Sequence, residues 1–180
     1  MPLIQGASKA KRFFDHVAPL YDRINARIYK REWLERVRSE VRGKRVLDVG
    51  VGTGFTTRHL GDAIGIDLSL AMLRRAEYRG HLLRADFMHP PFREEVFDSV
   101  VFAGSYYYMP NPEEAARTAA RLLRSGGRVV ILSPATPALG FAVRILGPQD
   151  YTSIFEDAGL EKVRYERLNW AAALVTAEKP

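Results

Sequence analysis

The feature that most constrains this chain is a run of glycines between two short apolar segments. The segment RVLDVGVGTGFTTRHLGDAIGIDLS, residues 45–69, begins as a β-branched strand and then turns through Gly50, Gly52 and Gly54. A second strand follows and ends at Asp67. Glycines at such a turn indicate that the backbone must approach a ligand or another backbone closely. The sequence therefore predicts a ligand site where the first strand ends.

The order of predicted elements indicates an α/β fold. Strands are expected at 45–50, 63–67, 81–87, 97–105, 128–134, 161–168 and 171–179, and helices at 13–41, 55–60, 69–79, 111–127 and 150–159. This alternation predicts a Rossmann-like, doubly wound, mostly parallel seven-stranded sheet with an antiparallel hairpin at its C-terminal edge. We expect residues 1–43 to form an N-terminal helical cap and residues 44–180 to form the Rossmann-like domain.

Composition excludes several classes of site. The 180 residues contain no cysteine, which excludes disulfides, a thiolate zinc site and a thiol nucleophile, and favours a cytoplasmic protein. No apolar run approaches the roughly 20 residues of a membrane-spanning helix, and the first residues lack the apolar core of a secretory signal. Arginine supplies 21 of the 27 basic residues, which is typical of a heat-adapted organism or of a GC-rich genome.

The glycine spacing separates three ligand classes. A phosphate-binding P-loop needs Lys and then Ser or Thr after its last glycine, but Phe55 and Thr56 follow Gly54 here. A dinucleotide fingerprint places its third glycine five residues after the first, and that position is Phe55. Asp67, 17 residues after Gly50, can still bind the hydroxyls of a ribose. The pattern therefore predicts a nucleoside ligand without a pyrophosphate, and S-adenosylmethionine has that shape.

Two more acids follow neighbouring strands. Asp48 precedes the glycine turn, where a carboxylate could orient the turn and meet a cationic ligand, and Asp86 follows the third strand. Asp86 could accept a hydrogen bond from an adenine amine, with Phe87 or Leu68 beside the ring. An aspartate after a strand also often caps a helix or turns the chain, which is the structural alternative for each of these acids.

The motifs resemble those of class I S-adenosylmethionine-dependent methyltransferases over essentially the whole chain. LDVGVGTG, GIDLSLAML and RADFMHPPF resemble the first three motifs of that superfamily, and FFDHVAPLYDRIN with YERLNWAAALVTAEK resembles the ubiquinone/menaquinone biosynthesis C-methyltransferases. The resemblance implies the cofactor S-adenosyl-L-methionine and a small-molecule acceptor. It implies cofactor-binding roles for Tyr21, Gly50, Gly52, Thr53, Gly54, Asp67, Asp86 and Phe87. We also expect Asp48, Leu68 and Ala103 at the cofactor, although Ala103 stands where that family usually has a polar residue.

The acceptor side departs from that family. The quinone enzymes carry a long insertion after the fifth strand, whereas only residues 133–149 occupy that interval here, and LGFAVRIL within it could touch a lipid surface or form a buried helix. Tyr106, Tyr107 and Tyr108 follow the fourth strand and predict an aromatic wall for a flat or apolar acceptor. His16, His89 and the same three tyrosines are candidate bases without an assigned role.

Three functional classes remain open from the sequence. The favoured class is a small-molecule methyltransferase. The alternatives are a nucleic-acid methyltransferase and a non-catalytic cofactor-binding protein. Residues 1–45 hold twelve basic against five acidic side chains, so this region could meet nucleic acid or anionic lipid, or could be a solvated helix face. The missing Asn/Asp-Pro-Pro-aromatic motif after the fourth strand argues against a nucleic-acid acceptor. Neither the oligomeric state nor a metal site follows from the sequence.

Overall fold

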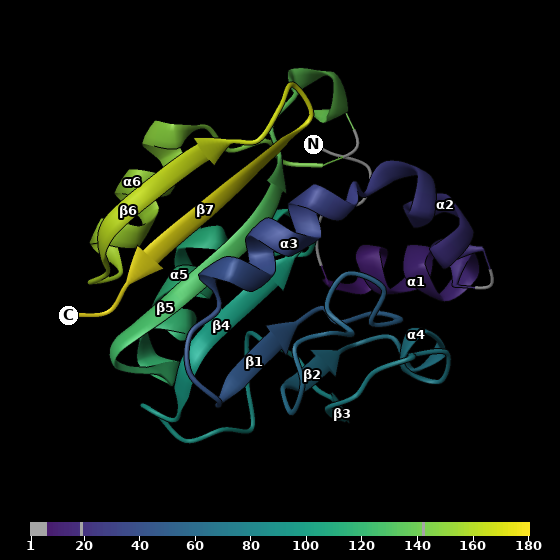
Figure 1. The fold of residues 1–180 in the computed structure, drawn as a ribbon, viewed down its shortest axis with the longest axis horizontal. Helices are drawn as coiled ribbons and strands as arrows, with labels where there is room; N and C mark the ends of the chain where they lie inside the picture. The colour runs from purple at the N-terminus through teal and green to yellow at the C-terminus, as the bar shows by residue number, and fades with distance from the viewer. Residues whose placement is uncertain (1–6, 19, 142) are drawn as a thin grey trace.

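A seven-stranded sheet organises the chain in the computed structural model, which describes residues 7–18, 20–141 and 143–180. The strand order is β3-β2-β1-β4-β5-β7-β6, as Figure 1 shows. The strands are β1 (Val46–Val49), β2 (Ile64–Asp67), β3 (His81–Arg84), β4 (Phe97–Ala103), β5 (Leu123–Pro134), β6 (Glu161–Arg167) and β7 (Ala172–Glu178). Strands β1 to β5 pair in parallel, and β7 pairs antiparallel with both β5 and β6. The predicted sheet and its antiparallel C-terminal hairpin are confirmed.

Helices cover both faces of this sheet and one of its ends. They are α1 (Ala7–Val17), α2 (Tyr21–Ile28), α3 (Arg31–Glu40), α4 (Leu70–Leu73), α5 (Pro112–Leu122) and α6 (Pro148–Asp157), with 3-10 turns η1 (Tyr106–Tyr108) and η2 (Pro137–Leu139). In Figure 1, α3 crosses one face, α5 and α6 lie on the other, and α1 and α2 lie beyond the carboxyl ends of β1, β2 and β4. Residues 1–6 and 19 of the predicted cap lie outside the described residues.

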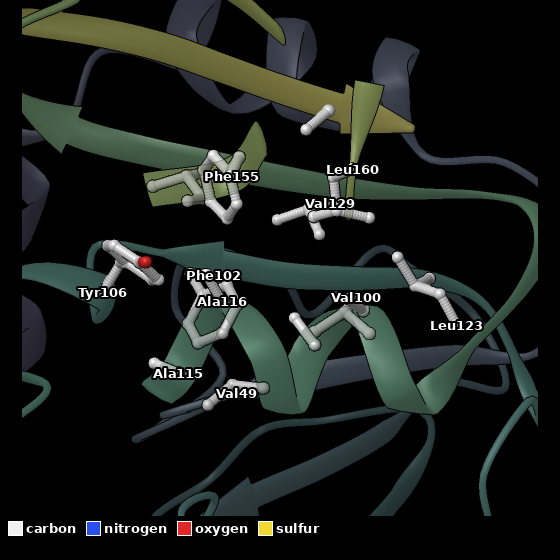
Figure 2. Packing of buried hydrophobic residues seen from close by; sticks show 14 of the residues in the cluster. Val49, Val100, Phe102, Tyr106, Ala115, Ala116, Leu123, Val129, Phe155 and Leu160 are labelled. Atoms are coloured by element: carbon white, nitrogen blue, oxygen red, sulfur yellow. The ribbon is translucent and has the colours of Figure 1, made fainter. Parts of the chain in front are cut away.

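Two apolar clusters hold the layers together. On one face, residues of α5 and α6 pack against β4 and β5, and Figure 2 shows Phe102 and Phe155 in this cluster. On the other face, Trp33 and Val37 of α3 pack against Val101 and residues of neighbouring strands. Because α3 is buried against the sheet, it belongs to the same packed body as the strands, whereas α1 and α2 cover the ends of the strands.

Helix α5 shows how local signals set an element. Asn111 caps it by accepting a hydrogen bond from the Glu114 N–H at 3.0 Å, and Pro112 occupies the first turn. The helix ends at Leu122, because Leu123 already pairs with Phe97 and begins β5. The expectation that the helix continues to residue 127 is therefore wrong. The residues after Leu122 favour a helix by propensity, but strand pairing places them in β5 instead.

Two other predicted helices are shorter or missing. Residues 55–60 form consecutive turns, in which the Arg58 N–H bonds Gly54 O at 2.7 Å and the Leu60 N–H bonds Thr57 O at 2.9 Å. The helix expected at 69–79 is reduced to α4, whose N-cap Ser69 accepts a hydrogen bond from the Met72 N–H at 3.1 Å. The prediction of a helix at 55–60 is therefore wrong, and the chain between β1 and β2 is a turn-rich loop.

Candidate functional site

A cavity lies at the carboxyl ends of β1 to β4, under α1 and α2. The cavity is open to solvent, and its empty volume, counted together with the space at its mouth, is about 740 Å³. It is lined by Lys11, Phe14 and Tyr21 above, and by Val49, Gly50, Gly52, Ile66, Asp67, Leu68, Met72, Ala85, Asp86, Phe87, Met88, Gly104, Ser105, Tyr108, Met109 and Pro110 from the strand ends. Its position agrees with the rule that open α/β sheets bind ligands outside the carboxyl ends of their strands.

The glycine turn reaches this cavity through Gly50 and Gly52. Gly50 has a φ of 69°, and a Cβ on it would lie 2.6 Å from the Cβ of Ser105. The N–H of Gly50 donates to Ile66 O at 2.8 Å, which ties the turn to β2. Only glycine satisfies both the left-handed backbone and the contact with Ser105. Gly54 lies outside the lining, where a Cβ would contact Glu77 O.

Asp67 is the carboxylate that the fold presents to the cavity from the end of β2. The Gly52 N–H donates to its Oδ2 at 2.9 Å, and the Ser69 N–H donates to its Oδ1 at 2.8 Å. Burial raises the pKa of Asp67, and the backbone hydrogen bonds oppose that rise. The turn that carries Gly52 and the carboxylate of Asp67 therefore hold each other in place, and the remaining lone pairs of the carboxylate are available to a ligand.

Asp48, expected to orient the glycine turn and to meet a cationic ligand, packs behind that turn. It is 1% exposed, it does not line the cavity, and its Oδ2 accepts a hydrogen bond from the Thr57 hydroxyl. Burial raises the pKa of Asp48 from 3.8 to about 7. Asp48 therefore holds the turn-rich loop behind the glycine turn and is separated from the cavity.

Thr53 and Ala103 also lie outside the cavity lining. The Thr53 hydroxyl donates to Asp22 Oδ1 of α2 at 2.5 Å, and the Thr53 side chain is buried. Ala103 ends β4, and its carbonyl accepts a hydrogen bond from the Thr56 hydroxyl at 3.4 Å. Thr53 thus links α2 to the glycine turn. Ala103 links the end of β4 to Thr56, in the loop that follows the glycine turn.

The end of β3 brings Asp86 beside apolar side chains. The Met88 N–H donates to Asp86 Oδ1 at 2.9 Å, so the carboxylate also closes a local turn. Phe87 is 4% exposed and packs edge-on against Phe102, with the ring centroids 5.1 Å apart. Leu68 contributes a further apolar surface to the same cavity. A carboxylate next to apolar walls can bind a flat ring that carries an exocyclic amine.

The three consecutive tyrosines point in three directions. They form the 3-10 turn η1, in which successive side chains are about 120° apart. Tyr106 points into the core, where it is fully buried and donates to Pro112 O at 2.7 Å (Figure 2). Tyr107 lies beside Tyr29, and Tyr108 alone lines the cavity. The predicted wall of three tyrosines is therefore replaced by one.

Helix α1 roofs the cavity with two residues that are not among the expected site residues. Lys11 and Phe14, three residues apart on one helical face, line the cavity. Lys11 pairs with Asp15 at 2.5 Å, and Asp15 Oδ1 accepts a hydrogen bond from the Ser69 hydroxyl at 2.5 Å. The i,i+3 spacing is the signal in the sequence that could have found them. The candidate bases His16 and His89 are both exposed and neither lines the cavity.

The polar groups that meet here form no metal site. No group of three or more potential metal ligands occurs among the residues that the structure describes. The described helices also include none that is long and apolar enough to cross a membrane.

Comparison with known proteins explains the arrangement. Residues 47–131, which run from β1 to β5, match the family described as Methyltransferase domain. The chain carries a methyltransferase domain. The matched part of this methyltransferase domain includes the glycine turn, Asp67 and Asp86, and it excludes the roof formed by α1 and α2.

Curated relatives extend over more of the chain. It is 28% identical to the chloroplastic 2-methyl-6-phytyl-1,4-hydroquinone methyltransferase 1 of Oryza sativa subsp. japonica, over 92% of this chain and 57% of that protein. It is 27% identical to the demethylmenaquinone methyltransferase of Lactiplantibacillus plantarum, over 89% of this chain and 91% of that protein. The chain thus spans little more than half the length of the plant relatives it matches.

Solved structures agree on the fold of the methyltransferase domain. A SAM-dependent methyltransferase from Thermotoga maritima, described as a possible histamine N-methyltransferase, superposes with a TM-score of 0.82 at 19% identity. The match covers 94% of this chain and 99% of that one. At this identity the likeness establishes the fold alone.

Proposed function

We propose that the chain transfers a methyl group from S-adenosyl-L-methionine to a small aromatic acceptor that carries a hydroxyl group. The observation that carries this proposal is Asp67, a carboxylate at the end of β2 that lines the cavity and is held there by the N–H groups of Gly52 and Ser69. A carboxylate at this place binds ribose hydroxyls in related sheets. The family match of residues 47–131 and the names of the relatives support the reaction class.

The residues around the cavity fit this cofactor from end to end. Asp67 would hold the ribose, Asp86 would accept from the adenine amine, and Leu68 and Phe87 would flank the adenine ring. The backbone at Gly50 and Gly52, where a side chain is excluded, would lie along the methionine part. Tyr21 of α2 would close over the cofactor.

The residues outside the lining have a supporting role in the same proposal. Asp48, Thr53, Gly54 and Ala103 hold the glycine turn and the loop behind it. In this proposal, α1 and α2 are the part of the predicted helical cap that takes part in function. It is fastened to the rest of the chain by the Thr53 bond to α2 and by the Ser69 bond to α1.

The reaction makes modest demands on the protein. The bound cofactor would supply a methyl group on a positively charged sulfur. The acceptor atom would bond to the methyl carbon in line with the breaking carbon–sulfur bond, and the proton released by the acceptor would pass to solvent. Alignment and exclusion of water supply most of the acceleration in such a displacement. The roof residues Lys11, Phe14 and Tyr21 would exclude water. We assign no general base.

The acceptor side of the cavity favours a flat, largely apolar molecule. Phe14 packs edge-on against Tyr108 with their ring centroids 5.1 Å apart, and Met109 and Pro110 continue this wall. The Tyr108 phenol is neutral at ordinary pH, as tyrosines are, and burial raises its pKa further, so it can donate a hydrogen bond to an acceptor oxygen. Relatives named for hydroquinone and menaquinone substrates support this class.

Calorimetry tests the cofactor. S-adenosylhomocysteine should bind with a dissociation constant near micromolar, about −8 kcal/mol. Asp67→Ala should weaken binding by about 1–3 kcal/mol, since charge-assisted hydrogen bonds to the ribose are lost. The exposed Asp62 lies just before β2, outside the cavity, and Asp62→Ala is the control. Binding of NADH without a response to S-adenosylhomocysteine would remove the proposal.

A methyl-transfer screen tests the acceptor. Hydroquinones and other small phenols should accept label from the cofactor, and bulk tRNA and rRNA should not. Tyr108→Phe should lower turnover while the affinity for S-adenosylhomocysteine stays within about threefold, or roughly 0.7 kcal/mol. Tyr165→Phe on the distant strand β6 is the control. Labelling of RNA without labelling of any small molecule would favour the nucleic-acid class instead.

The proposed location is the cytoplasm, and the proposed source is a heat-adapted organism. The lack of cysteine and the arginine-rich composition support these two proposals. Fractionation of the native host tests the location, and a melting temperature above about 70 °C would support heat adaptation, since mesophile domains melt at about 45–65 °C.

A further inference from the structure

The outer face of α1 combines exposed cations with an exposed aromatic ring. Lys9, Arg12, Phe13 and His16 are all exposed, and their spacing of three and four residues places them together on the helix. Phe13 keeps 41% of its surface exposed, and Leu20, just beyond the helix, keeps 55%. These four residues of α1 together with Leu20 make up the outer face.

The acidic residue of α1 does not neutralise this outer face. Asp15 turns inward, where it is held by Lys11 and by the Ser69 hydroxyl. Within residues 7–18, 20–141 and 143–180, neither Lys9 nor Arg12 has an acidic partner within 4.0 Å. The outer face therefore keeps its positive charge free for an anionic partner.

We infer that the outer face of α1 docks on an anionic lipid bilayer. Cations with interspersed apolar side chains on one helical face are typical of helices that lie in the membrane interface. Nucleic acid fits less well, because the aliphatic Leu20 neither stacks on bases nor binds phosphate, whereas a bilayer accepts both the apolar side chains and the cations. No spanning helix is needed for this mode of attachment.

The same helix links the bilayer to the cavity. Phe13 points outward, while its neighbour Phe14 lines the cavity beside Tyr108. Docking through the outer face would place the roof of the cavity at the membrane surface, where a lipid-like acceptor is dissolved. This last step rests on the proposed function, whereas the docking itself rests only on the exposed residues.

Vesicle binding by the full chain tests the inference. Binding to phosphatidylcholine vesicles containing about a third phosphatidylglycerol should be at least about tenfold stronger than to phosphatidylcholine alone, and should weaken as salt is added. The double change Lys9→Gln with Arg12→Gln should remove the preference for anionic vesicles. Arg93→Gln with Arg121→Gln, two exposed arginines far from α1 in sequence, should leave it unchanged.

The apolar part is tested separately. Phe13→Ser with Leu20→Ser should weaken binding to anionic vesicles by about tenfold or more. Leu82→Ser with Leu83→Ser is the matched control, because these leucines of β3 are 38% and 39% exposed. Affinity for S-adenosylhomocysteine should be unchanged in both pairs, which shows that each variant is folded.

A fluorescence readout covers the case in which the serine variants fail to fold. Trp33 is 6% exposed and Trp170 is 72% exposed. In a Trp170→Phe background, Phe13→Trp should therefore report on α1, and its emission should shift to the blue when anionic vesicles are added. The absence of any shift would overturn the inference.

The outcomes separate this inference from the proposed function. Intact affinity for S-adenosylhomocysteine without vesicle binding overturns the inference alone. Vesicle binding without affinity for S-adenosylhomocysteine overturns the proposed function and keeps the docking face. Binding of an RNA oligonucleotide that depends on Lys9 and Arg12, without vesicle binding, replaces the bilayer by nucleic acid.

Discussion

Asp48 is fully inside the protein, so its replacement by asparagine should change how stability depends on pH. Burial raises the pKa of Asp48 to about 7 in the folded chain, against 3.8 as its ordinary value. The folded state therefore favours the protonated carboxyl, and the unfolded state releases the proton at much lower pH. Stability contributed by this proton is fully present below about pH 3.8 and is lost as the pH rises to about 7.

The expected magnitude follows from the two pKa values. Because a difference of one between the folded and unfolded pKa corresponds to 1.36 kcal/mol, the full cost of ionising buried Asp48 is about 4 kcal/mol above pH 7. At pH 5 the cost is only about 1–2 kcal/mol, since the folded carboxyl is still protonated. Asparagine has nearly the same shape and does not ionise. The Asp48→Asn variant should therefore gain stability relative to the wild type, by about 3 kcal/mol more at pH 9 than at pH 5.

The surroundings of Asp48 suit an amide. The Thr57 hydroxyl can still donate to the side-chain oxygen of asparagine. The Tyr78 hydroxyl is buried without a hydrogen-bond partner and lies close enough to Asp48 to affect its charge, so it can accept from the new amide. The substitution therefore keeps the Thr57 hydrogen bond and gives one of the two amide N–H groups an acceptor.

Guanidinium denaturation, followed by circular dichroism at pH 5, 7 and 9, measures the effect on both proteins. The exposed Asp62→Asn variant is the control, and its stability difference from the wild type should not vary with pH by more than about 0.5 kcal/mol. The affinity of Asp48→Asn for S-adenosylhomocysteine should stay close to that of the wild type, since Asp48 does not line the cavity. An Asp48→Asn variant that is destabilised equally at pH 5 and pH 9 would refute the reasoning.

Three further changes test other parts of the structure. Gly50→Ala should abolish binding of S-adenosylhomocysteine, measured by calorimetry, because its Cβ would lie 2.6 Å from that of Ser105 at a φ of 69°. Arg128→Met should lower the free energy of unfolding by about 3 kcal/mol in urea titrations. The reason is that Glu40 and Glu178 lose the largely buried arginine with which both form ion pairs. Arg121→Met, at an exposed arginine, is the control. Deletion of residues 1–25 should leave a folded core that binds cofactor poorly and has no turnover, and full activity of that truncation would remove any catalytic part for the cap.

The sheet could be predicted from sequence because each strand has a local signature. Buried β-branched runs such as FDSVVFA stop at glycine or at a polar residue, and alternation with helices fixes the parallel order. The acids Asp67 and Asp86 follow from the same signal, since Asp67 ends β2 and Asp86 lies shortly after the end of β3, at the same edge of the sheet. The order of the strands and the positions of these two acids along the chain are therefore enough to predict that both carboxylates line one cavity.

Other parts could not be predicted because distant contacts decide them. Residues 55–60 have the composition of a short helix, but Thr57 bonds Asp48 and holds the chain in turns instead. Asp48 has the same local pattern as Asp67, and only the loop packed over it separates it from the cavity. Lys11 enters the site because α1 packs against α4, which is a tertiary arrangement without a motif.

The 3-10 turn after β4 makes the acceptor wall sensitive to chain length. Each position of η1 faces the core, Tyr29 or the cavity according to its place in the turn, so a single-residue insertion or deletion before Tyr106 would exchange these positions. A substitution at Tyr108 alters one side chain, whereas an indel presents a different residue to the acceptor and pushes another into the apolar interior. Among descendants of this chain, changes of acceptor should therefore arise by point substitution at residue 108, and length changes between 104 and 109 should be removed by selection for folding.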